Sequence, residues 1–274
     1  MSIYADRSDR GKLAFTGPQR AWFLHQIMTN SFDPLAAGEV REAALLTPHG
    51  RMVGYLEAVA TEDAILCHFE PELRETFPDA IRSYVFATQV EITDVTDEMG
   101  LVLVAGSDLK APAAAAAVQR THALGVPASY VWSERKTHEE LIRELEAAGF
   151  RAASEDELEA IRIANGAPRW GRDINEKTLP QEARLEDVAI HFDKGCYVGQ
   201  EAVAKIHFRG KVNRKLRRLE AAAPLPVGAE AMIDGQRVGV VTSSSGPYAL
   251  AMLRYTVEPG AVVVAEEIEA KVVA

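Results

Sequence analysis

Residues 194–201 of the chain read Lys194-Gly195-Cys196-Tyr197-Val198-Gly199-Gln200-Glu201. The two glycines leave the backbone around the cysteine free to turn sharply or to approach a ligand closely. The residues from Gln200 onward are typical of the opening of a short helix, which would put Cys196 near a helix N-terminus. A neighbouring lysine and a helix N-terminus both favour thiolate over thiol. Cys196, with Lys194 beside it, is therefore a candidate catalytic group, and a small buried residue in a turn is the alternative of about equal weight.

The composition of the chain is that of an ordinary globular protein. Of its 274 residues, 47% are hydrophobic and 26% are charged, and the formal net charge is −10. This acidity argues against a general affinity for nucleic acid or for anionic membranes. No stretch approaches the roughly 18 apolar residues that span a bilayer, and residues 1–10 do not form a secretory signal. Together with the low cysteine count, these features predict a cytoplasmic protein.

Two cysteines do not by themselves make a metal centre. Zinc sites and four-iron clusters need about four ligands. Cys67 lies in the apolar run 64–69, which predicts a buried strand, and is interpreted as a core residue. His25, His49 and His207 have no metal-ligand partners at telling spacing, so no metal site is predicted.

Hydrophobic periodicity and turn residues predict a mixed α+β body. Strands are expected at 12–16, 43–46, 52–60, 64–69, 89–95, 101–104 and 129–132, and helices at 19–28, 71–84, 111–123, 137–148 and 155–164. The helix at 19–28 would bury Trp22, Phe23 and Ile27, and Ser154 with Glu157 forms a capping box before the last helix. Residues 167–193 lack periodicity, and a loop of that length inside a domain is usually functional.

The pattern changes after about residue 210. Short alternating runs, split mostly by glycine and proline, follow at 212–219, 229–233, 237–242, 248–253, 261–265 and 268–273. Strands at such spacing predict a small antiparallel β-barrel. We therefore expect an α+β body over residues 1–208 and a C-terminal β-barrel over residues 209–274.

The cysteine octapeptide resembles the K-G-C-Y/F-x-G-Q-E signature of the YgfZ-type folate-binding proteins, which are relatives of the glycine-cleavage T-protein, an aminomethyltransferase. Further segments agree with that family in the expected order: residues 23–30 (F-L-H-Q-I-M-T-N), 45–51 (L-L-T-P-H-G-R), 162–171 (R-I-A-N-G-A-P-R-W-G) and 179–183 (L-P-Q-E-A). The resemblance covers essentially the whole chain. The octapeptide is highly specific, and the other segments are individually weak.

The resemblance implies a T-protein-like ring of subdomains around a central cavity that binds tetrahydrofolate, with the C-terminal barrel closing the ring. It also implies a role in the assembly or repair of iron–sulfur clusters in client enzymes, among them radical enzymes that modify transfer RNA. In such proteins the signature cysteine, here Cys196, is required. The partners implied are iron–sulfur client enzymes or assembly proteins.

One position departs from the aminomethyltransferases. Their corresponding helix end reads R-L-E-A-G, and its Glu holds the pterin edge, whereas the matching residue here is Ala164. Each charge-assisted hydrogen bond from such a carboxylate is worth roughly 1.5–3 kcal/mol. Its absence favours an accessory factor over the alternative, a tetrahydrofolate-dependent aminomethyltransferase or demethylase. A folate-free docking scaffold stays open as a third alternative.

Candidate folate contacts lie on the segments that carry the resemblance and near the octapeptide. They are Asn30, Thr47, Tyr84, Arg162, Trp170, Gln200 and Glu201. Several have a simpler structural alternative: Tyr84 and Trp170 as core aromatics, Gln200 as a surface residue, and Glu201 as a first-turn carboxylate that faces the helix dipole.

Residues 205–218 form a basic run without an acidic residue. Its cations are Lys205, Arg209, Lys211, Arg214, Lys215, Arg217 and Arg218. The run is a candidate contact for a folate polyglutamate tail, for an acidic partner or for RNA held by a client enzyme. The alternative is a solvated strand and loop beside the barrel. Direct nucleic-acid binding is not expected from a chain of this net charge.

Overall fold

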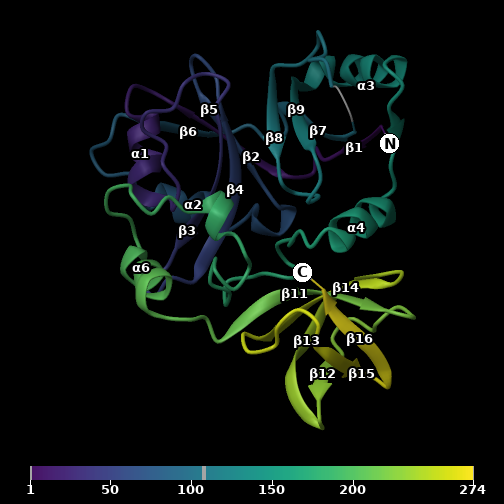
Figure 1. Cartoon of the computed structure of the whole chain (residues 1–274). Helices are drawn as coiled ribbons and strands as arrows, with labels where there is room; N and C mark the ends of the chain where they lie inside the picture. Colours follow the sequence, from purple (N-terminus) through teal and green to yellow (C-terminus); the bar gives the residue numbers. More distant parts are fainter. Residues whose placement is uncertain (1, 107–108, 274) are drawn as a thin grey trace.

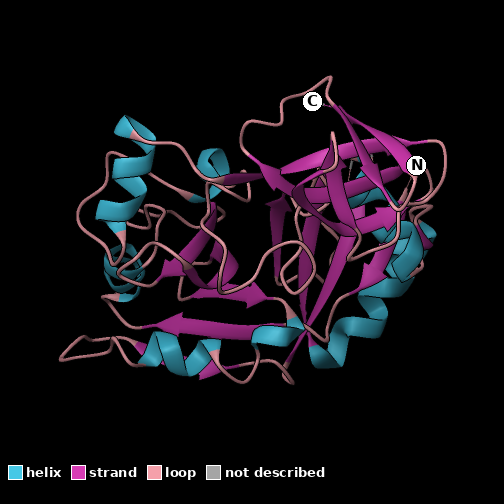
Figure 2. Ribbon diagram, turned by 90° about the horizontal axis from the view of Figure 1, so that it is seen from below, coloured by secondary structure: helices cyan, strands magenta, loops and turns pink. Residues whose placement is uncertain are grey.

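The alternating apolar runs of the sequence form two five-stranded sheets and one closed barrel in a computed structural model that describes residues 2–106 and 109–273. In Figure 1 the two sheets lie side by side above the barrel, which is built from the C-terminal part of the chain. Figure 2 shows the strands inside and most helices at the periphery. This arrangement confirms the predicted α+β fold with a C-terminal antiparallel barrel.

The first sheet has the strand order β10-β1-β7-β9-β8. Its strands are β1 (Ile3–Asp6), β7 (Met99–Ala105), β8 (Ala117–Thr121), β9 (Ala128–Glu134) and β10 (Arg151–Ala152). The predicted helix at 111–123 is wrong, because residues 117–121 pair antiparallel with β9 at the sheet edge. The alanines at 113–116 lie in a turn before this strand, which contains only Ala117 of the alanine-rich run. Strand β1, in the polar-looking N-terminus, was not predicted. Helix α3 (His138–Ala147) packs against this sheet through Leu141 and Leu145.

The second sheet has the strand order β3-β4-β5-β2-β6. Its strands are β2 (Gly11–Thr16), β3 (Val40–Leu46), β4 (Met52–Ala60), β5 (Ile65–Phe69) and β6 (Glu91–Asp94). The predicted meander over residues 43–69 is confirmed by the β3–β4 and β4–β5 pairs. One face of the sheet is apolar and is covered by α1 (Arg20–Ile27) and α2 (Phe77–Arg82).

Two predictions about these covering helices were wrong in part. Trp22 of α1 is 45% exposed instead of buried, while Phe23 and Ile27 enter the core as expected. The helix expected over residues 71–84 is divided into a 3-10 turn at Pro71–Leu73 and helix α2. Pro78 stands in the first turn of α2, a position where proline starts a helix because its missing N–H is not needed there.

The barrel closes through pairs of β11 with both β14 and β16. Its strands are β11 (Arg214–Ala221), β12 (Glu230–Ile233), β13 (Gln236–Ser245), β14 (Tyr248–Arg254), β15 (Val262–Ala265) and β16 (Ile268–Val273). Small and branched residues fill the interior, among them Leu219, Val241 and Val272. Each of these strands corresponds to one of the alternating runs predicted after residue 210.

Helix α4 (Glu155–Ala164) joins the first sheet to the barrel. The Ser154 side chain accepts a hydrogen bond from the Glu157 N–H at 3.2 Å, which confirms half of the predicted capping box, while the Glu157 carboxylate pairs with Arg151. Ile163 packs on Leu216 and Leu250 of the barrel. The segment after α4 contains the short helix α5 (Glu186–Ala189) and then α6 (Gln200–Arg209), and both lie beside the second sheet (Figure 1).

Candidate functional site

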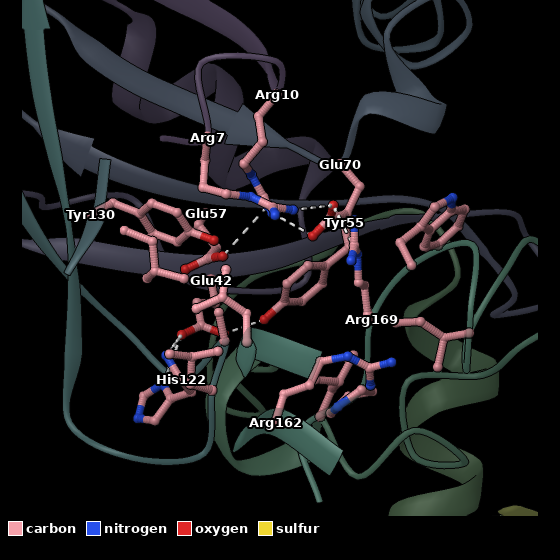
Figure 3. A pocket seen from close by; sticks show the side chains of 18 of the residues that line it. Arg7, Arg10, Glu42, Tyr55, Glu57, Glu70, His122, Tyr130, Arg162 and Arg169 are labelled. Atoms are coloured by element: carbon pink, nitrogen blue, oxygen red, sulfur yellow. Dashed lines mark hydrogen bonds and ion pairs between the residues drawn. The ribbon is translucent and has the colours of Figure 1, made fainter. Parts of the chain in front are cut away.

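A cavity of about 170 Å³ lies between the two sheets and is closed by α4 and by the segment 168–188. The antiparallel register explains why charged side chains meet there. Glu42 on β3 stands opposite Glu57 on β4, and Glu57 stands opposite His68 on β5. Paired residues share one face of a sheet, and the opposite face of this sheet is already covered by α1 and α2. The polar row therefore faces the first sheet and the cavity (Figure 3).

Arg10 is the central cation of the site. Its Nε donates to His68 Nδ1 at 2.9 Å, and its guanidinium pairs with Glu70 and lies 3.7 Å from Glu57 Oε1. The guanidinium carbon is 5.3 Å from the ring centre of Tyr130, within the range of a cation–π contact. Burial and the neighbouring cations hold the pKa of His68 well below its usual range, so its neutral ring accepts from Arg10.

Two carboxylates stand next to each other beyond Arg10. Glu42 accepts hydrogen bonds from the Tyr55 hydroxyl and, at 3.2 Å, from the backbone N–H of His122, and its Oε1 lies 2.7 Å from the Nδ1 of that residue. Glu57 accepts a hydrogen bond from Thr121 Oγ1 at 2.5 Å. Burial raises the pKa of Glu57 to about 8, the charge of Glu42 adds to this, and Arg10 opposes it. At neutral pH this part of the cavity therefore holds a proton that an ordinary glutamate would have lost.

The wall opposite Glu57 contains three buried polar atoms without a hydrogen-bond partner in the described part of the chain. They are Arg7 Nε, Glu70 Oε2 and Arg169 Nε. Arg169 Nε lies 3.5 Å and Arg7 Nη2 lies 3.8 Å from Glu70 Oε2, so these groups form one cluster. Buried polar groups are almost always satisfied, so this cluster is suited to a polar ligand or to water.

Two larger hollows adjoin the central cavity at different residues. One, of about 1,370 Å³, shares Glu42, His122 and Val188 with it. The other, of about 650 Å³, shares Arg7 and Glu155. The central cavity therefore borders these hollows at side chains that can titrate or form ion pairs: Glu42 and His122 on one side, and Arg7 and Glu155 on the other.

Three of the predicted folate contacts line these cavities. Arg162 and Trp170 line the central cavity, and both are buried. Asn30 lines the hollow of about 1,370 Å³, where its Nδ2 donates to the carbonyls of Glu42 at 2.9 Å and Val188 at 3.1 Å.

The other four predicted contacts lie outside the three cavities. Thr47 belongs to the β3–β4 turn, where its Oγ1 accepts from the Arg51 N–H at 3.2 Å. Tyr84 follows α2 and is 38% exposed. Gln200 and Glu201 begin α6, and Glu201 is an exposed carboxylate in its first turn, the position that the structural alternative describes.

The Lys194 side chain anchors the cysteine loop to the end of α1. Its buried Nζ donates to the carbonyls of His25, Met28 and Asn30, the last two at 2.6 and 3.1 Å. Burial lowers the pKa of Lys194 to about 8. A cation is stabilised at the C-terminal end of a helix, so this contact holds the cysteine loop against the end of α1. Cys196, two residues on, is exposed and does not line the central cavity or the two hollows beside it.

Gly199 fixes the other end of the cysteine loop. It caps α6 with a φ of +82°, and a Cβ on it would lie 2.5 Å from the Thr47 carbonyl oxygen. We expect Gly199→Ala to lower the free energy of unfolding by about 1–3 kcal/mol and to change the alkylation rate of Cys196, because the loop must move away from Thr47. Urea unfolding and timed alkylation measure both effects. Gly195→Ala is the matched control, since a Cβ there meets nothing within 4 Å. Equal effects of the two variants would contradict the prediction.

The basic run is largely paired in its second half. Arg214 pairs with Glu182 at 3.1 Å, Lys215 with Glu186 at 3.3 Å and Arg217 with Glu258 at 2.9 Å, and Arg218 donates to the Ala164 carbonyl at 2.6 Å. Lys205 and Arg209 are exposed on α6. The simpler alternative, a strand beside the barrel, therefore describes residues 214–218.

The sequence pattern did not reveal most of the polar groups of the central cavity. They are Arg7, Arg10, Glu42, Tyr55, Glu57, Glu70, His122, Tyr130 and Arg169. One signal was present. Glu57 is the single charge in the otherwise apolar strand 52–60, where a charge is rarely buried unless it has partners.

Known proteins resemble this chain in fold and, over parts of it, in sequence. Residues 213–273 match the family of the CAF17 C-terminal beta-barrel domain. A chloroplastic Arabidopsis thaliana protein whose name calls it a transferase is 26% identical over 270 residues, which are 89% of this chain and 62% of that protein. The chain thus spans less than two thirds of the length of this relative.

Two shorter matches concern named iron–sulfur and transfer-RNA proteins. The human mitochondrial iron-sulfur cluster assembly factor IBA57 is 34% identical over 100 residues, or 34% of this chain and 28% of that protein. The tRNA-modifying protein YgfZ of Buchnera aphidicola is 45% identical over 56 residues, or 20% of this chain and 17% of that protein.

The crystal structure of the glycine cleavage system aminomethyltransferase T from Bartonella henselae superposes with a TM-score of 0.87 at 18% identity. The match covers 100% of this chain and 85% of that one, and it confirms the predicted fold. Within the described residues, no helix is long and apolar enough to cross a membrane.

Proposed function

We propose that this chain, which is similar to the YgfZ- and CAF17-type proteins and has the aminomethyltransferase fold, is a tetrahydrofolate-binding accessory factor for the assembly or repair of iron–sulfur clusters in client enzymes. The observation that carries the proposal is the exposed Cys196 on a loop that is anchored at both ends and lies apart from a polar cavity. One part of the chain would bind the folate, and another part would present a thiol to a partner.

The central cavity would receive the pterin end of tetrahydrofolate. A pterin presents an N–H donor and a carbonyl acceptor side by side, and the ion-paired Glu70 Oε2 and Arg169 Nε, 3.5 Å apart and without hydrogen bonds among the residues described, would offer it an acceptor and a donor. A volume of about 170 Å³ is below the roughly 300–1,000 Å³ of sites for drug-sized ligands, so the cavity would take the bicyclic ring and not the whole folate.

The remainder of the folate would lie in the adjoining hollow of about 1,370 Å³. Arg41 and Arg120 line this hollow and would pair with the carboxylates of the glutamate tail. Bound there, tetrahydrofolate would supply an amine that carries one-carbon units. Arg162 and Trp170 would bound the pterin from the side of α4, and the two sheets would exclude water from it.

The thiol of Cys196 would serve a cluster or a partner and not the folate directly. A single thiolate provides one of the roughly four ligands that a four-iron cluster needs, so any cluster must also bind to another chain or to small thiols. An exposed position allows such sharing, whereas a buried one would not. We propose that the protein acts in the cytoplasm, where thiols are kept reduced and disulfides are rare. The body over residues 1–208 would hold the folate, and the barrel over residues 209–274 would close its site.

The aminomethyltransferase fold favours a second candidate, folate-dependent aminomethyl transfer. Ala164, where the aminomethyltransferase pattern has Glu, argues against it. Incubation with an aminomethylated lipoyl carrier and tetrahydrofolate distinguishes the two candidates. Formation of methylenetetrahydrofolate would favour the aminomethyltransferase over the accessory factor.

We expect calorimetry to show micromolar binding of tetrahydrofolate to the wild type and to Cys196→Ser alike, because Cys196 lies outside the cavity. Glu70→Gln should weaken binding at least tenfold, because a carboxylate acceptor of the pterin edge is lost. Glu75→Gln, at an exposed position, is the matched control. Binding by the wild type alone would put Cys196 in the folate site. No binding by any variant would favour the docking scaffold.

A further inference from the structure

The Glu42–Glu57 pair of the central cavity has no part in the folate contacts proposed above. Directly opposite residues on antiparallel strands have Cβ atoms about 4.5–5.5 Å apart. Two ionised carboxylates on such neighbouring, largely buried side chains repel each other, so one of them keeps its proton. The hydrogen-bond donors around each carboxylate show which one.

Glu42 has the better set of donors for the charged form. The Tyr55 hydroxyl and the His122 backbone N–H donate to it, and the His122 ring lies 2.7 Å from its Oε1. Glu57 has one hydroxyl donor, and it shares Arg10 with Glu70, which is the nearer carboxylate. The proton of the pair therefore belongs to Glu57, consistent with its raised pKa. The titratable or charged groups that face Glu57 are Arg10, Glu42, Tyr55, His68, Glu70, His122 and Tyr130.

His122 connects this pair with solvent. Its side chain is 72% exposed, and both His122 and Glu42 line the central cavity as well as the hollow of about 1,370 Å³. In Figure 3, Glu42 lies between the His122 ring and the Glu57 carboxyl. The Glu42 carboxylate raises the pKa of His122, so the ring carries a proton more readily than a free histidine. His122, Glu42 and Glu57 thus stand in that order from solvent to the cavity: His122 contacts Glu42, and Glu42 is the cross-strand neighbour of Glu57.

We infer that Glu57 is the acid–base group of the central cavity and that Glu42 and His122 exchange its proton with solvent. In the forward step the Glu57 O–H bond breaks as an N–H bond forms on a basic nitrogen of the bound ligand, which leaves a carboxylate and a cation. Glu42 then passes to Glu57 the proton that it takes from the His122 imidazolium, and His122 is reprotonated from water. The reverse sequence removes a proton from the ligand. The identity of the ligand rests on the proposed function, and the proton path does not.

The first test needs no ligand. The folded pKa of Glu57 lies above its unfolded value, so its contribution to stability is complete below about pH 4.5 and is lost as the pH rises toward 8. We expect the midpoint urea concentration of the wild type to fall between pH 5 and pH 8, and that of Glu57→Gln to change much less. Glu75→Gln, at an exposed position, should follow the wild type. Carbon-13 NMR of labelled glutamate in the wild type follows the carboxyl directly, should Glu57→Gln fail to fold. A Glu57 that is ionised throughout this pH range would overturn the assignment.

The second test measures protons when tetrahydrofolate binds. Calorimetry in two buffers of different ionisation heat gives the number of protons exchanged, which should be non-zero in the wild type and near zero in Glu57→Gln. His122→Gln should keep the raised pKa of Glu57 and slow its proton exchange with solvent, as read from the line width of the Glu57 carboxyl. Binding with the same proton count in wild type and Glu57→Gln would overturn the inference. Absence of binding would instead overturn the proposed function. The protonation state of Glu57 would then be decided by the ligand-free titration by itself.

Discussion

Asp173→Ala is expected to lower the free energy of unfolding by about 3–5 kcal/mol, because it removes the fully buried carboxylate of the Arg162 ion pair and leaves two barrel hydroxyls without this acceptor. The Asp173 side chain is fully buried and lies 2.7 Å from Arg162 Nη1. It also accepts hydrogen bonds from the Thr242 and Ser243 hydroxyls of the barrel at 2.6 and 2.7 Å. The same carboxylate therefore holds α4 and the barrel together.

Urea unfolding measures this loss, and its slope reports whether the barrel unfolds with the rest of the chain. Asp63→Ala, at an exposed turn, is the matched control and should change stability by less than about 0.5 kcal/mol. Asp173→Asn retains the shape and some of the hydrogen bonds, and should fall between the two. A loss below about 1 kcal/mol in Asp173→Ala would show that the ion pair does not hold the barrel.

Cys196→Ser is expected to abolish the support of iron–sulfur client enzymes while the fold stays intact. The exposed Cys196 side chain is part of no core cluster, so the stability change should stay within about 0.5 kcal/mol. A serine hydroxyl is not a soft thiolate ligand, so iron binding and thiol chemistry are both lost. Client-enzyme activity in cells that depend on this chain should fall to the level of cells without it.

Cys67 provides the control for this experiment. It is a fully buried member of the core beneath α1, and burial raises the pKa of its thiol. Cys67→Ser should destabilise the fold by about 1–3 kcal/mol and still support the client enzymes to the extent that it folds. Alkylation of the folded wild type should label one thiol, and alkylation in urea two. Full complementation by Cys196→Ser would contradict the proposed role of the thiol.

The barrel and the β3–β4–β5 meander were predictable because their signal is local. Each alternating run is bounded by its own turn residues. Its apolar residues alternate with polar ones because only one face of the sheet, or the interior of the barrel, is buried. The signal for the Ser154 cap was likewise contained within four residues. Strand β8 was not predictable in this way, since only its pairing with β9 makes residues 117–121 extended. Trp22 fits the apolar period of α1, but it is partly exposed, because the period does not show which positions of the helix other segments cover.

The candidate site was predictable only where a segment resembled a family. Arg162 and Trp170 were named on that ground, and both line the cavity. The Glu42–Glu57 pair depends on the register of β3 against β4, which the sequence does not specify residue by residue. Lys194 shows that closeness in sequence to the cysteine does not predict which groups a side chain contacts. It adjoins the cysteine in the chain, yet its ammonium binds the carbonyls of residues 25–30, far upstream.

Asn30 connects the two parts of the proposed function. Its side chain bonds the Val188 carbonyl at the rim of the cavity, and its own carbonyl accepts the Lys194 ammonium that anchors the cysteine loop. If a ligand in the cavity shifts this residue, the affinity of the loop for a client changes by some factor, and the client must change the affinity for that ligand by the same factor. A client docked at Cys196 would then change the affinity of the cavity for folate. In return, the affinity of the loop for the client would depend on the concentration of folate in the cell.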